Sequence, residues 1–321
     1  MTLRGESHGR RKSKIEWYDA TWNPITGCTP VSEGCRNCYA ARMVNRFPKL
    51  HGTYPEGTPL ADFAVPFGML QFHDRHLDQP LRWKRPRRIF VGSMTDIFHE
   101  NVPEEWIGAV LAAITNYSQH AFLILTKRPE RMRKVMTADY LRISRTDTWP
   151  IRNLCLGVSV ETQKTADERI PLLLQTPAAK RFASVEPCIG AVDLRNIALP
   201  LWREKEANDS TWPPVRIDAL SGHVKGPDDL MDDRLDWIIC GGETGPGARP
   251  MHPDWVRGLR DQCKATNTPF FFKQWGKWPD GVSHGPNAKD GAYAMARVGK
   301  KAASCLLDGQ EHKEFPVIIN G

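Results

Sequence analysis

The sequence lacks any apolar run long enough to cross a bilayer. Spanning a membrane takes roughly 20 consecutive apolar residues, and no segment of this 321-residue chain approaches that length. The first 14 residues are charged and have no apolar centre, so they do not resemble a secretory signal. These absences argue against an embedded protein and a membrane partner, and they lead us to expect a cytoplasmic location.

Cysteine is scarce outside one short stretch. The chain has 8 cysteines, and in a reducing compartment such thiols are more often free or metal-bound than paired in disulfides. Cys28, Cys35 and Cys38 lie close together in a C-x6-C-x2-C pattern. The others are dispersed, and we interpret them as core or incidental thiols: Cys155, Cys188, Cys240, Cys263 and Cys305.

The cysteine stretch lacks the second C-x2-C pair that structural zinc sites usually show. Gly27 and Gly34 each precede a cysteine, and glycine lets a backbone turn tightly and approach a bulky ligand. Three thiolates suit an iron–sulfur cluster with one open iron. They also supply three ligands of a zinc site, which a histidine such as His51 could complete. A third interpretation is that they are structural thiols.

The net charge of +7 is compatible with a polyanionic partner without requiring one. Basic side chains gather in residues 10–14 and again in residues 82–88. The second cluster consists of Arg82, Lys84, Arg85, Arg87 and Arg88. Contact with nucleic acid and a solvated surface both remain open as interpretations of these clusters.

The middle of the chain alternates between apolar runs and amphipathic segments. Strands are predicted at residues 88–96, 121–127, 153–161, 180–186, 236–243 and 269–275, with a short one before the cysteine stretch. Helical periodicity lies between them, which indicates a parallel sheet covered by helices. A flat doubly wound sheet would carry a Gly-rich phosphate loop after its first strand, and this chain has none there. About seven strands therefore favour an α/β fold with a complete or partial (β/α) TIM-like barrel.

The barrel is predicted to span residues 16–276. Residues 1–15 are basic and aperiodic, and we predict that they form a disordered tail. A long polar segment, residues 188–234, is predicted to be an insertion within the barrel. The Gly-rich residues 277–321 are predicted to form a C-terminal extension that lies on it.

The strand ends are the expected place for chemistry, because active sites of parallel β/α arrays form at the carboxyl ends of the strands. The cysteine stretch follows the first strand and should join that edge. The candidates for catalysis are Lys127, Glu161, Glu186 and Lys273, acting in proton transfer, as counter-ions or as ligands for a carboxylate or phosphate. The candidates for cofactor or substrate binding are Ser93, Asp96, Ser159, Gly241, Gly242 and Glu243.

Short motifs spread from residue 15 to residue 316 carry a family resemblance. They are residues 15–28 (IEWYDATWNPITGC), 34–40 (GCRNCYA), 93–96 (SMTD), 125–129 (LTKRP), 157–161 (GVSVE), 184–187 (SVEP), 241–243 (GGE), 249–251 (RPM), 272–276 (FKQWG), 308–309 (DG) and 314–316 (EFP). In this combination the chain resembles the phage-associated three-Cys-motif proteins. That family is described as a domain of unknown function and is regarded as similar to radical S-adenosylmethionine (SAM) enzymes. A phage gene would place the protein in the host cytoplasm.

By this resemblance, Cys28, Cys35 and Cys38 would bind three irons of a [4Fe–4S] cluster, and the fourth iron would take the amino and carboxylate groups of SAM. Cleavage of SAM would yield a 5′-deoxyadenosyl radical that abstracts hydrogen, while the protein positions and shields the cofactor. A flavodoxin or ferredoxin would donate the electron. The substrate would be a small molecule or a nucleic acid, the latter held by the basic patch of residues 82–88.

Two features differ from the radical SAM pattern. The first cysteine interval is x6 instead of x3, and the GGE motif of residues 241–243 follows a late strand instead of the second. We therefore expect Asp96 or Ser93 to bind the SAM amine, and Glu243 to bind ribose or substrate. Tyr39, which follows the third cysteine, is expected to pack beside the adenine.

The resemblance, together with these patterns, implies a radical SAM enzyme with an unassigned reaction and substrate. The missing fourth cysteine agrees with this prediction, because that coordination position would belong to the cofactor. The alternative is a zinc-binding, nucleic-acid-binding protein without redox chemistry.

Overall fold

The computed structural model describes residues 17–45, 66–138, 149–199, 215–225, 233–278 and 304–317. The predicted disordered tail, residues 1–15, lies outside the described residues, as does His51. Parts of the predicted insertion and of the C-terminal extension are described.

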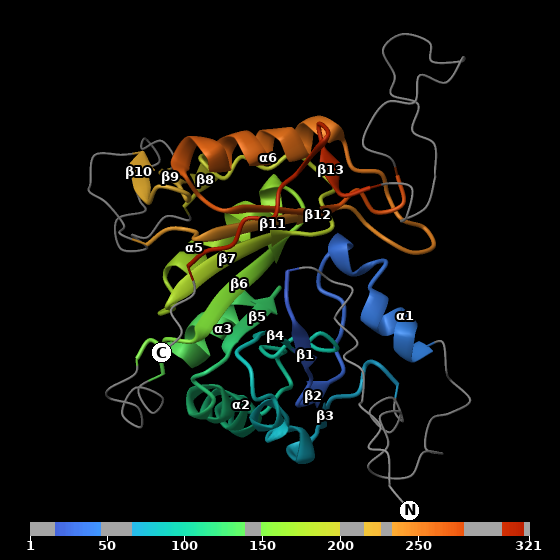
Figure 1. The fold of residues 1–321 in the computed structure, drawn as a ribbon, viewed down its shortest axis with the longest axis vertical. Helices are drawn as coiled ribbons and strands as arrows, with labels where there is room; N and C mark the ends of the chain where they lie inside the picture. Colours follow the sequence, from blue (N-terminus) through green and yellow to red (C-terminus); the bar gives the residue numbers. More distant parts are fainter. Residues whose placement is uncertain are drawn as a thin grey trace, which may run out of the picture.

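A seven-stranded parallel sheet organises the chain (Figure 1). Its strands, in spatial order, are β1 (Ala20–Trp22), β4 (Arg88–Val91), β5 (Ala121–Thr126), β6 (Leu154–Val160), β7 (Lys180–Val185), β11 (Trp237–Gly241) and β12 (Phe270–Gln274). Spatial order follows chain order, so each crossover adds the next strand on the same side and the strand order never reverses. The prediction of a parallel α/β sheet is confirmed.

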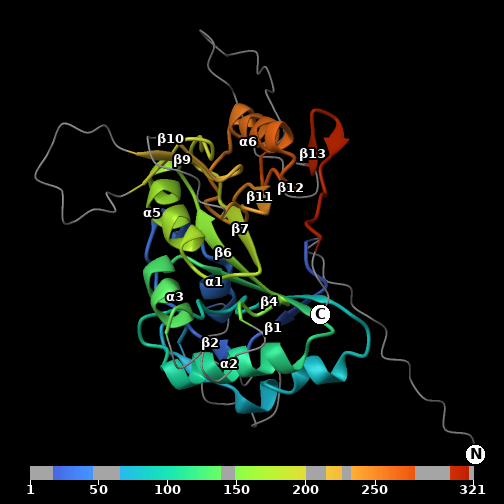
Figure 2. The same ribbon diagram turned by 90° about the vertical axis from the view of Figure 1, so that its left-hand side faces the viewer.

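The sheet curls into a half-barrel, which Figures 1 and 2 show from two sides. Its edge strands are β1 and β12, and within the described residues no strand joins them. The architecture is consistent with the partial form of the predicted (β/α) barrel.

Four helices cover the convex face of the sheet. They are α2 (Glu104–Asn116), α3 (Pro129–Met136), α5 (Gln163–Leu174) and α6 (Pro253–Thr266). Their apolar faces pack with alternate strand residues such as Ile89, Phe122 and Leu156 in one large core. A capping box between Thr162 and Thr165 fixes the start of α5. Helix α1 (Tyr39–Asn45) lies instead on the open side of the curl (Figure 1).

The concave face has its own aromatic core, built from the intervening strand residues. Trp17, Phe182, Trp237 and Phe271 pack there in edge-to-face and tilted ring contacts. Gly157 makes room for one of these rings, because a Cβ atom at that position would collide with Phe182. This aromatic cluster fills part of the concave face, and a cavity lies beside it toward the carboxyl edge.

The described residues also form smaller sheets outside the main sheet. Strands β8 (Ile197–Ala198), β9 (Arg216–Asp218) and β10 (His223–Lys225) form an antiparallel sheet within the predicted insertion. The hairpin of β13 (Leu306–Leu307) and β14 (Gln310–Glu311) belongs to the predicted extension. It is held on α6 by Asp308, whose carboxylate pairs with Arg257 and Arg260. Strands β2 (Ile25–Thr26) and β3 (Gln71–Phe72) pair beside the cysteine stretch.

The predicted strand at residues 88–96 is too long. The strand β4 ends at Val91, because Gly92 adopts a positive φ of 76° and turns the chain out of the sheet. Residues 93–96 form a loop at the carboxyl edge, which is where the candidate residues Ser93 and Asp96 lie. Among the helices of the described residues, none is long and apolar enough to span a membrane.

A candidate active site at the carboxyl edge of the sheet

The three cysteines sit on a loop that crosses the mouth of the half-barrel between β2 and α1. Gly27 starts this loop with a positive φ of 97°, and a side chain there would collide with the backbone of Met69. A short 3-10 turn, η1 (Glu33–Cys35), precedes α1. The backbone N–H of Cys38 donates to the carbonyl of Cys35 at 3.1 Å. This turn brings the last two cysteines to the start of α1.

A cavity of about 290 Å³ lies between the cysteine loop and the concave face. This volume is close to the lower bound of roughly 300 Å³ for small-molecule sites. Among the predicted site residues that line it are Cys28, Cys35, Cys38, Tyr39, Ser93, Asp96, Lys127, Ser159, Glu186, Gly242, Glu243 and Lys273. Two predicted site residues, Glu161 and Gly241, lie behind the wall of the cavity. The convergence expected from the strand ends therefore brings most of the candidates to one place.

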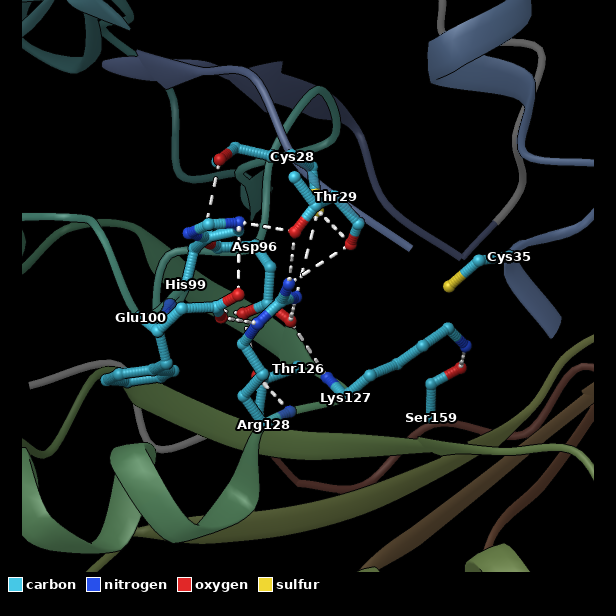
Figure 3. A network of polar contacts seen from close by, with 12 residues as sticks. Cys28, Thr29, Cys35, Asp96, His99, Glu100, Thr126, Lys127, Arg128 and Ser159 are labelled. Carbon is cyan, nitrogen blue, oxygen red and sulfur yellow. Dashed lines mark hydrogen bonds and ion pairs between the residues drawn. The ribbon is translucent and has the colours of Figure 1, made fainter. Parts of the chain in front are cut away.

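Arg128 connects the cysteine loop to the end of β5 (Figure 3). Its guanidinium donates to the Asp96 carboxylate at 3.2 Å, to the Cys28 sulfur at 3.8 Å and to the Thr29 carbonyl at 3.0 Å. It also pairs with Glu100. The sequence prediction gave a catalytic role to the neighbouring Lys127 and no site role to this arginine, although both follow the end of β5. The position directly after a strand end was the available signal.

The Asp96 carboxylate is already occupied by donors of the protein. It accepts from the Thr126 hydroxyl at 2.7 Å, the Lys127 N–H at 3.0 Å, the Phe98 N–H at 3.1 Å and Arg128 at 3.2 Å. Such a carboxylate has little capacity left for a cofactor amine. In this structure Asp96 orients Arg128.

Ser93 and Tyr39 lie together at the rim of the same cavity. The Tyr39 hydroxyl donates to the Ser93 carbonyl, and the Ser93 hydroxyl donates to the Asn23 side chain at 3.1 Å. Tyr39 is half exposed, with 47% of its surface accessible. The tyrosine ring is thus fixed at its hydroxyl end while the rest of the ring remains open to a ligand.

The three cysteines border the same cavity without converging on one point. All three cysteines are free thiols that line one cavity. Within the described part of the chain, no three His, Cys, Asp or Glu side chains lie close enough to hold one metal ion. Figure 3 shows Cys35 set apart from the network around Cys28. Sulfurs spread around a cavity can bind separate corners of a cluster, whereas one zinc ion needs them to converge.

Cys28 is held as a neutral thiol. Burial, reinforced by the nearby Asp96, raises the pKa of Cys28 to about 11, although Arg128 opposes this shift. The thiolate is the form that binds metal. A metal ion that binds this sulfur would therefore displace the Cys28 proton.

Lys127 and Glu161 form an ion pair beneath the cysteine loop, in which the Glu161 carboxylate has a full set of donors. Lys127 donates to Glu161 and to Ser159, both at 2.6 Å. Glu161 also accepts from Arg169 at 3.2 Å and from Ser32 at 3.0 Å, and its side chain is 1% exposed. Burial raises the pKa of Glu161, but Lys127 and Arg169 outweigh it and leave the pKa below its usual value.

Lys273 and Glu186 form a second pair, which lines the cavity itself. The Lys273 ammonium lies 3.1 Å from each Glu186 oxygen, and the Ser184 hydroxyl donates to Glu186 at 3.3 Å. The two side chains are 23% and 17% exposed. Glu161 and Glu186 therefore each pair with a separate lysine and do not form one carboxylate pair.

Glu243 clamps the cysteine loop to the far side of the half-barrel. Its carboxylate accepts from the Arg249 side chain at 2.7 and 3.0 Å, and from the Asn37 amide at 2.9 Å. Arg249 also donates to the Glu33 carbonyl at 3.0 Å. Arg42 adds a donation from α1 to the Thr244 carbonyl at 2.9 Å. Glu243 thus supports the loop, with both oxygens engaged by the protein.

The glycines of the GGE motif make room for groups of the protein. A side chain on Gly241 would collide with the Glu186 carboxylate, and one on Gly242 with the Trp275 carbonyl. Gly34 is similar, since a Cβ atom there would collide with the Glu161 carboxylate. The absence of a side chain at these three positions thus accommodates groups of the protein, while Gly34 and Gly242 also line the cavity.

The basic patch of residues 82–88 lies at the other edge of the sheet. It precedes β4, so it stands at the amino end of a strand whose carboxyl end faces the cysteines. Arg82 pairs with Asp78, and Arg88 pairs with Asp19, while Lys84 and Arg85 are exposed. A polyanion on this patch would be separated from the cavity by the length of the strands.

The fold and the site define an α/β protein with a parallel half-barrel and a thiol-lined cavity at its carboxyl edge. The model of a family described as "Protein of unknown function (DUF5131)" matches residues 12–316. The chain belongs to this family. No curated protein and no solved structure matches the chain. The family description assigns no reaction, cofactor or biological source.

Proposed function

We propose that the protein is a radical SAM enzyme with a [4Fe–4S] cluster bound by Cys28, Cys35 and Cys38. The observation that carries the proposal is that three free thiols line one cavity at the carboxyl edge of a parallel half-barrel. This edge is where enzymes with parallel β/α architecture place their chemistry. When bound, the cluster and SAM would supply one-electron reductive chemistry that activates a C–H bond of the substrate.

The chain's own groups position the three cysteines. Arg128 donates to the Cys28 sulfur, and this N–H···S bond would persist when the sulfur is a thiolate. Asn37 lies between the other two cysteines and is anchored on Glu243. The loop is therefore fixed from both sides of the half-barrel before any cofactor binds.

The side chains around the cavity would bind the cofactor and exclude water. Ser93 and Tyr39 stand beside the cysteines, where they would contact SAM. Phe90 and Leu125 line the inner wall, and apolar walls protect reactive species from solvent. Glu186 and Lys273 are the charged pair that reaches into the same space.

The proposal includes partners that deliver the electron and the substrate. A flavodoxin or ferredoxin would donate the electron, and the substrate would be a small molecule or a nucleic acid. The net charge of +7 supports an anionic partner. The basic patch of residues 82–88 would contact such a partner at the amino edge of the sheet.

Anaerobic reconstitution with iron and sulfide tests the cluster. We expect about four irons and four sulfides per chain, and a large loss of both in Cys28→Ala, Cys35→Ala and Cys38→Ala. Cys305→Ala is the matched control, because this thiol does not line the cavity and contacts Glu311 instead, and the variant should bind iron normally. A colourless wild-type protein, or one holding a single zinc ion, would contradict the proposal.

A further inference from the structure

The Glu186–Lys273 pair has hydrogen-bonding capacity left over, and it faces the cavity. A lysine ammonium has three N–H donors, and a carboxylate has about four acceptor sites. Lys273 donates a hydrogen bond to Glu186 Oε2, which also accepts from Ser184, and the ammonium makes an ion-pair contact with Oε1 at 3.1 Å. When all these contacts among the described residues are counted, one N–H donor of Lys273 and one acceptor site of Glu186 remain side by side.

The other lysine–glutamate pair of this edge has no such remainder on its carboxylate. Glu161 accepts from Lys127 and Ser32, and both of its oxygens accept from Arg169. That carboxylate is also shielded by Gly34 of the cysteine loop. Of the two carboxylates, Glu186 therefore keeps an acceptor site for a ligand and Glu161 does not.

Part of the wall of the same cavity is aromatic. Phe90 lines the cavity and stacks on Tyr18, with ring centroids 5.3 Å apart and an interplanar angle of 24°. Leu125 and Trp17 line the same space. The Trp17 indole N–H is buried and has no hydrogen-bond partner within the described residues. Stacking on such a surface is worth roughly 1–3 kcal/mol per base.

We propose that this cavity binds a nucleobase whose edge carries a carbonyl next to an N–H, as in uracil, thymine or guanine. The carbonyl accepts from Lys273, the ring N–H donates to Glu186, and the ring lies against Phe90 and Leu125. The assignment rests on the proposed function, because it treats this cavity as the substrate chamber of that enzyme. It narrows the substrate class to nucleosides, nucleotides or unpaired bases of a nucleic acid.

The test is equilibrium binding of uridine, thymidine and guanosine to the full chain, measured by calorimetry without SAM and again after anaerobic reconstitution with SAM. We expect at least one of them to bind. The corresponding 3-methyluridine, 3-methylthymidine or 1-methylguanosine lacks the ring N–H. It should bind with an affinity at least roughly tenfold lower, since a hydrogen bond to a charged group is lost.

Glu186→Gln should weaken binding by a similar factor. Glu168→Gln is the matched control, because Glu168 forms an exposed pair with Lys164 on α5, away from the cavity, and it should leave the affinity unchanged. The methylated nucleosides test the same contact without a protein variant, so a folding defect in Glu186→Gln would not obscure the result.

Three results would overturn the inference. They are no binding of any of the three nucleosides, equal binding of the methylated forms, or equal binding by Glu186→Gln and Glu168→Gln. Binding of adenosine or SAM alone, dependent on Glu186, would also overturn it by assigning the pair to the cofactor. Nucleoside binding is measured without iron, so it tests this inference independently of the cluster. A chain that binds nucleosides but assembles no cluster would contradict the proposed function and not this inference.

Discussion

Two lysine–glutamate pairs stand on the same edge of the sheet and use the same side-chain types. Lys127 and Glu161 follow β5 and β6, and they are tied to Arg169, Ser32 and Ser159 in a buried network. Lys273 and Glu186 come from β12 and the end of β7, and they face the cavity with fewer partners. The first pair holds the cysteine loop in place, whereas the second is available to a ligand.

The two pairs differ in their number of protein partners because different segments lie over them. The cysteine loop lies directly over Glu161, and Gly34 allows the contact. No equivalent contact to that loop is found for Glu186 among the described residues. A desolvated ion pair tolerates no missing partner, whereas a partly solvated pair can exchange partners. The same residue types therefore serve stability at one position and binding at the other.

The largest expected effect is on the buried pair. Glu161→Gln leaves Lys127 and Arg169 without their counter-charge in a buried site, which should lower the free energy of unfolding by roughly 3–5 kcal/mol. Urea unfolding of the wild type and the variant measures this change. Glu168→Gln, in an exposed pair, should change stability by less than about 1 kcal/mol. Equal losses of unfolding free energy in the two variants would show that the Glu161 pair is no more important for stability than an exposed pair.

The next effect concerns the fit of the cysteine loop over Glu161. Gly34→Ala places a methyl group against the Glu161 carboxylate, and such overpacking typically costs about 1–3 kcal/mol. The matched control is Gly108→Ala in α2, where a Cβ atom meets no other atom within 4 Å. That helix substitution should be neutral or stabilising by up to about 1 kcal/mol. A Gly34→Ala protein as stable as Gly108→Ala would show that the loop does not press on Glu161.

Lowering the pH should destabilise the folded protein through His99. Burial, together with Arg128, lowers the pKa of His99 below its ordinary value near 6.5. Below about pH 6.5 the unfolded chain gains a proton that the folded chain does not, so the free energy of unfolding falls as the pH drops.

His99→Gln should reduce this pH dependence, since glutamine does not titrate and retains a donor for the Thr29 hydroxyl, which His99 contacts at 2.8 Å. Urea unfolding of both proteins between pH 7.5 and 5.5 provides the measurement. A slope that stays the same in the variant would remove His99 as the titrating group.

The smallest effect on stability is expected at the open pair. Glu186→Gln should change the free energy of unfolding by about 1 kcal/mol or less, because the pair is partly solvated. The same variant should lose nucleoside binding roughly tenfold. Measuring unfolding and calorimetric binding on one preparation makes the contrast with Glu161→Gln direct. A destabilisation as large as that of Glu161→Gln would mean that both pairs are structural.

Much of the fold could be predicted from the sequence, because buried parallel strands are continuous apolar runs. The predicted segments at residues 121–127, 153–161 and 180–186 match β5, β6 and β7 to within one residue at each end. The segment at residues 88–96 was overextended, since apolar Met94 packs beneath α1 and not in the sheet. Whether the barrel is partial or complete depends on pairing between distant edge strands, which periodicity does not report.

The gathering of site residues was also predictable, because the carboxyl ends of parallel strands share one edge. Their individual roles were not. Glu243 is joined to Asn37 across 206 positions of the chain, and Arg249 engages the same carboxylate. Such partners are set by how loops cross the mouth of the half-barrel. The sequence therefore indicated where the charged groups meet but not which of them are already satisfied.

We propose that the three cysteines support reductive cleavage of SAM. The most direct test of this proposal is anaerobic incubation of the reconstituted full chain with SAM and dithionite, followed by quantification of 5′-deoxyadenosine. The account predicts that 5′-deoxyadenosine forms with the wild type and with Cys305→Ala, and not with Cys28→Ala, Cys35→Ala or Cys38→Ala. A wild-type protein with a full complement of iron and sulfide that forms no 5′-deoxyadenosine would contradict it.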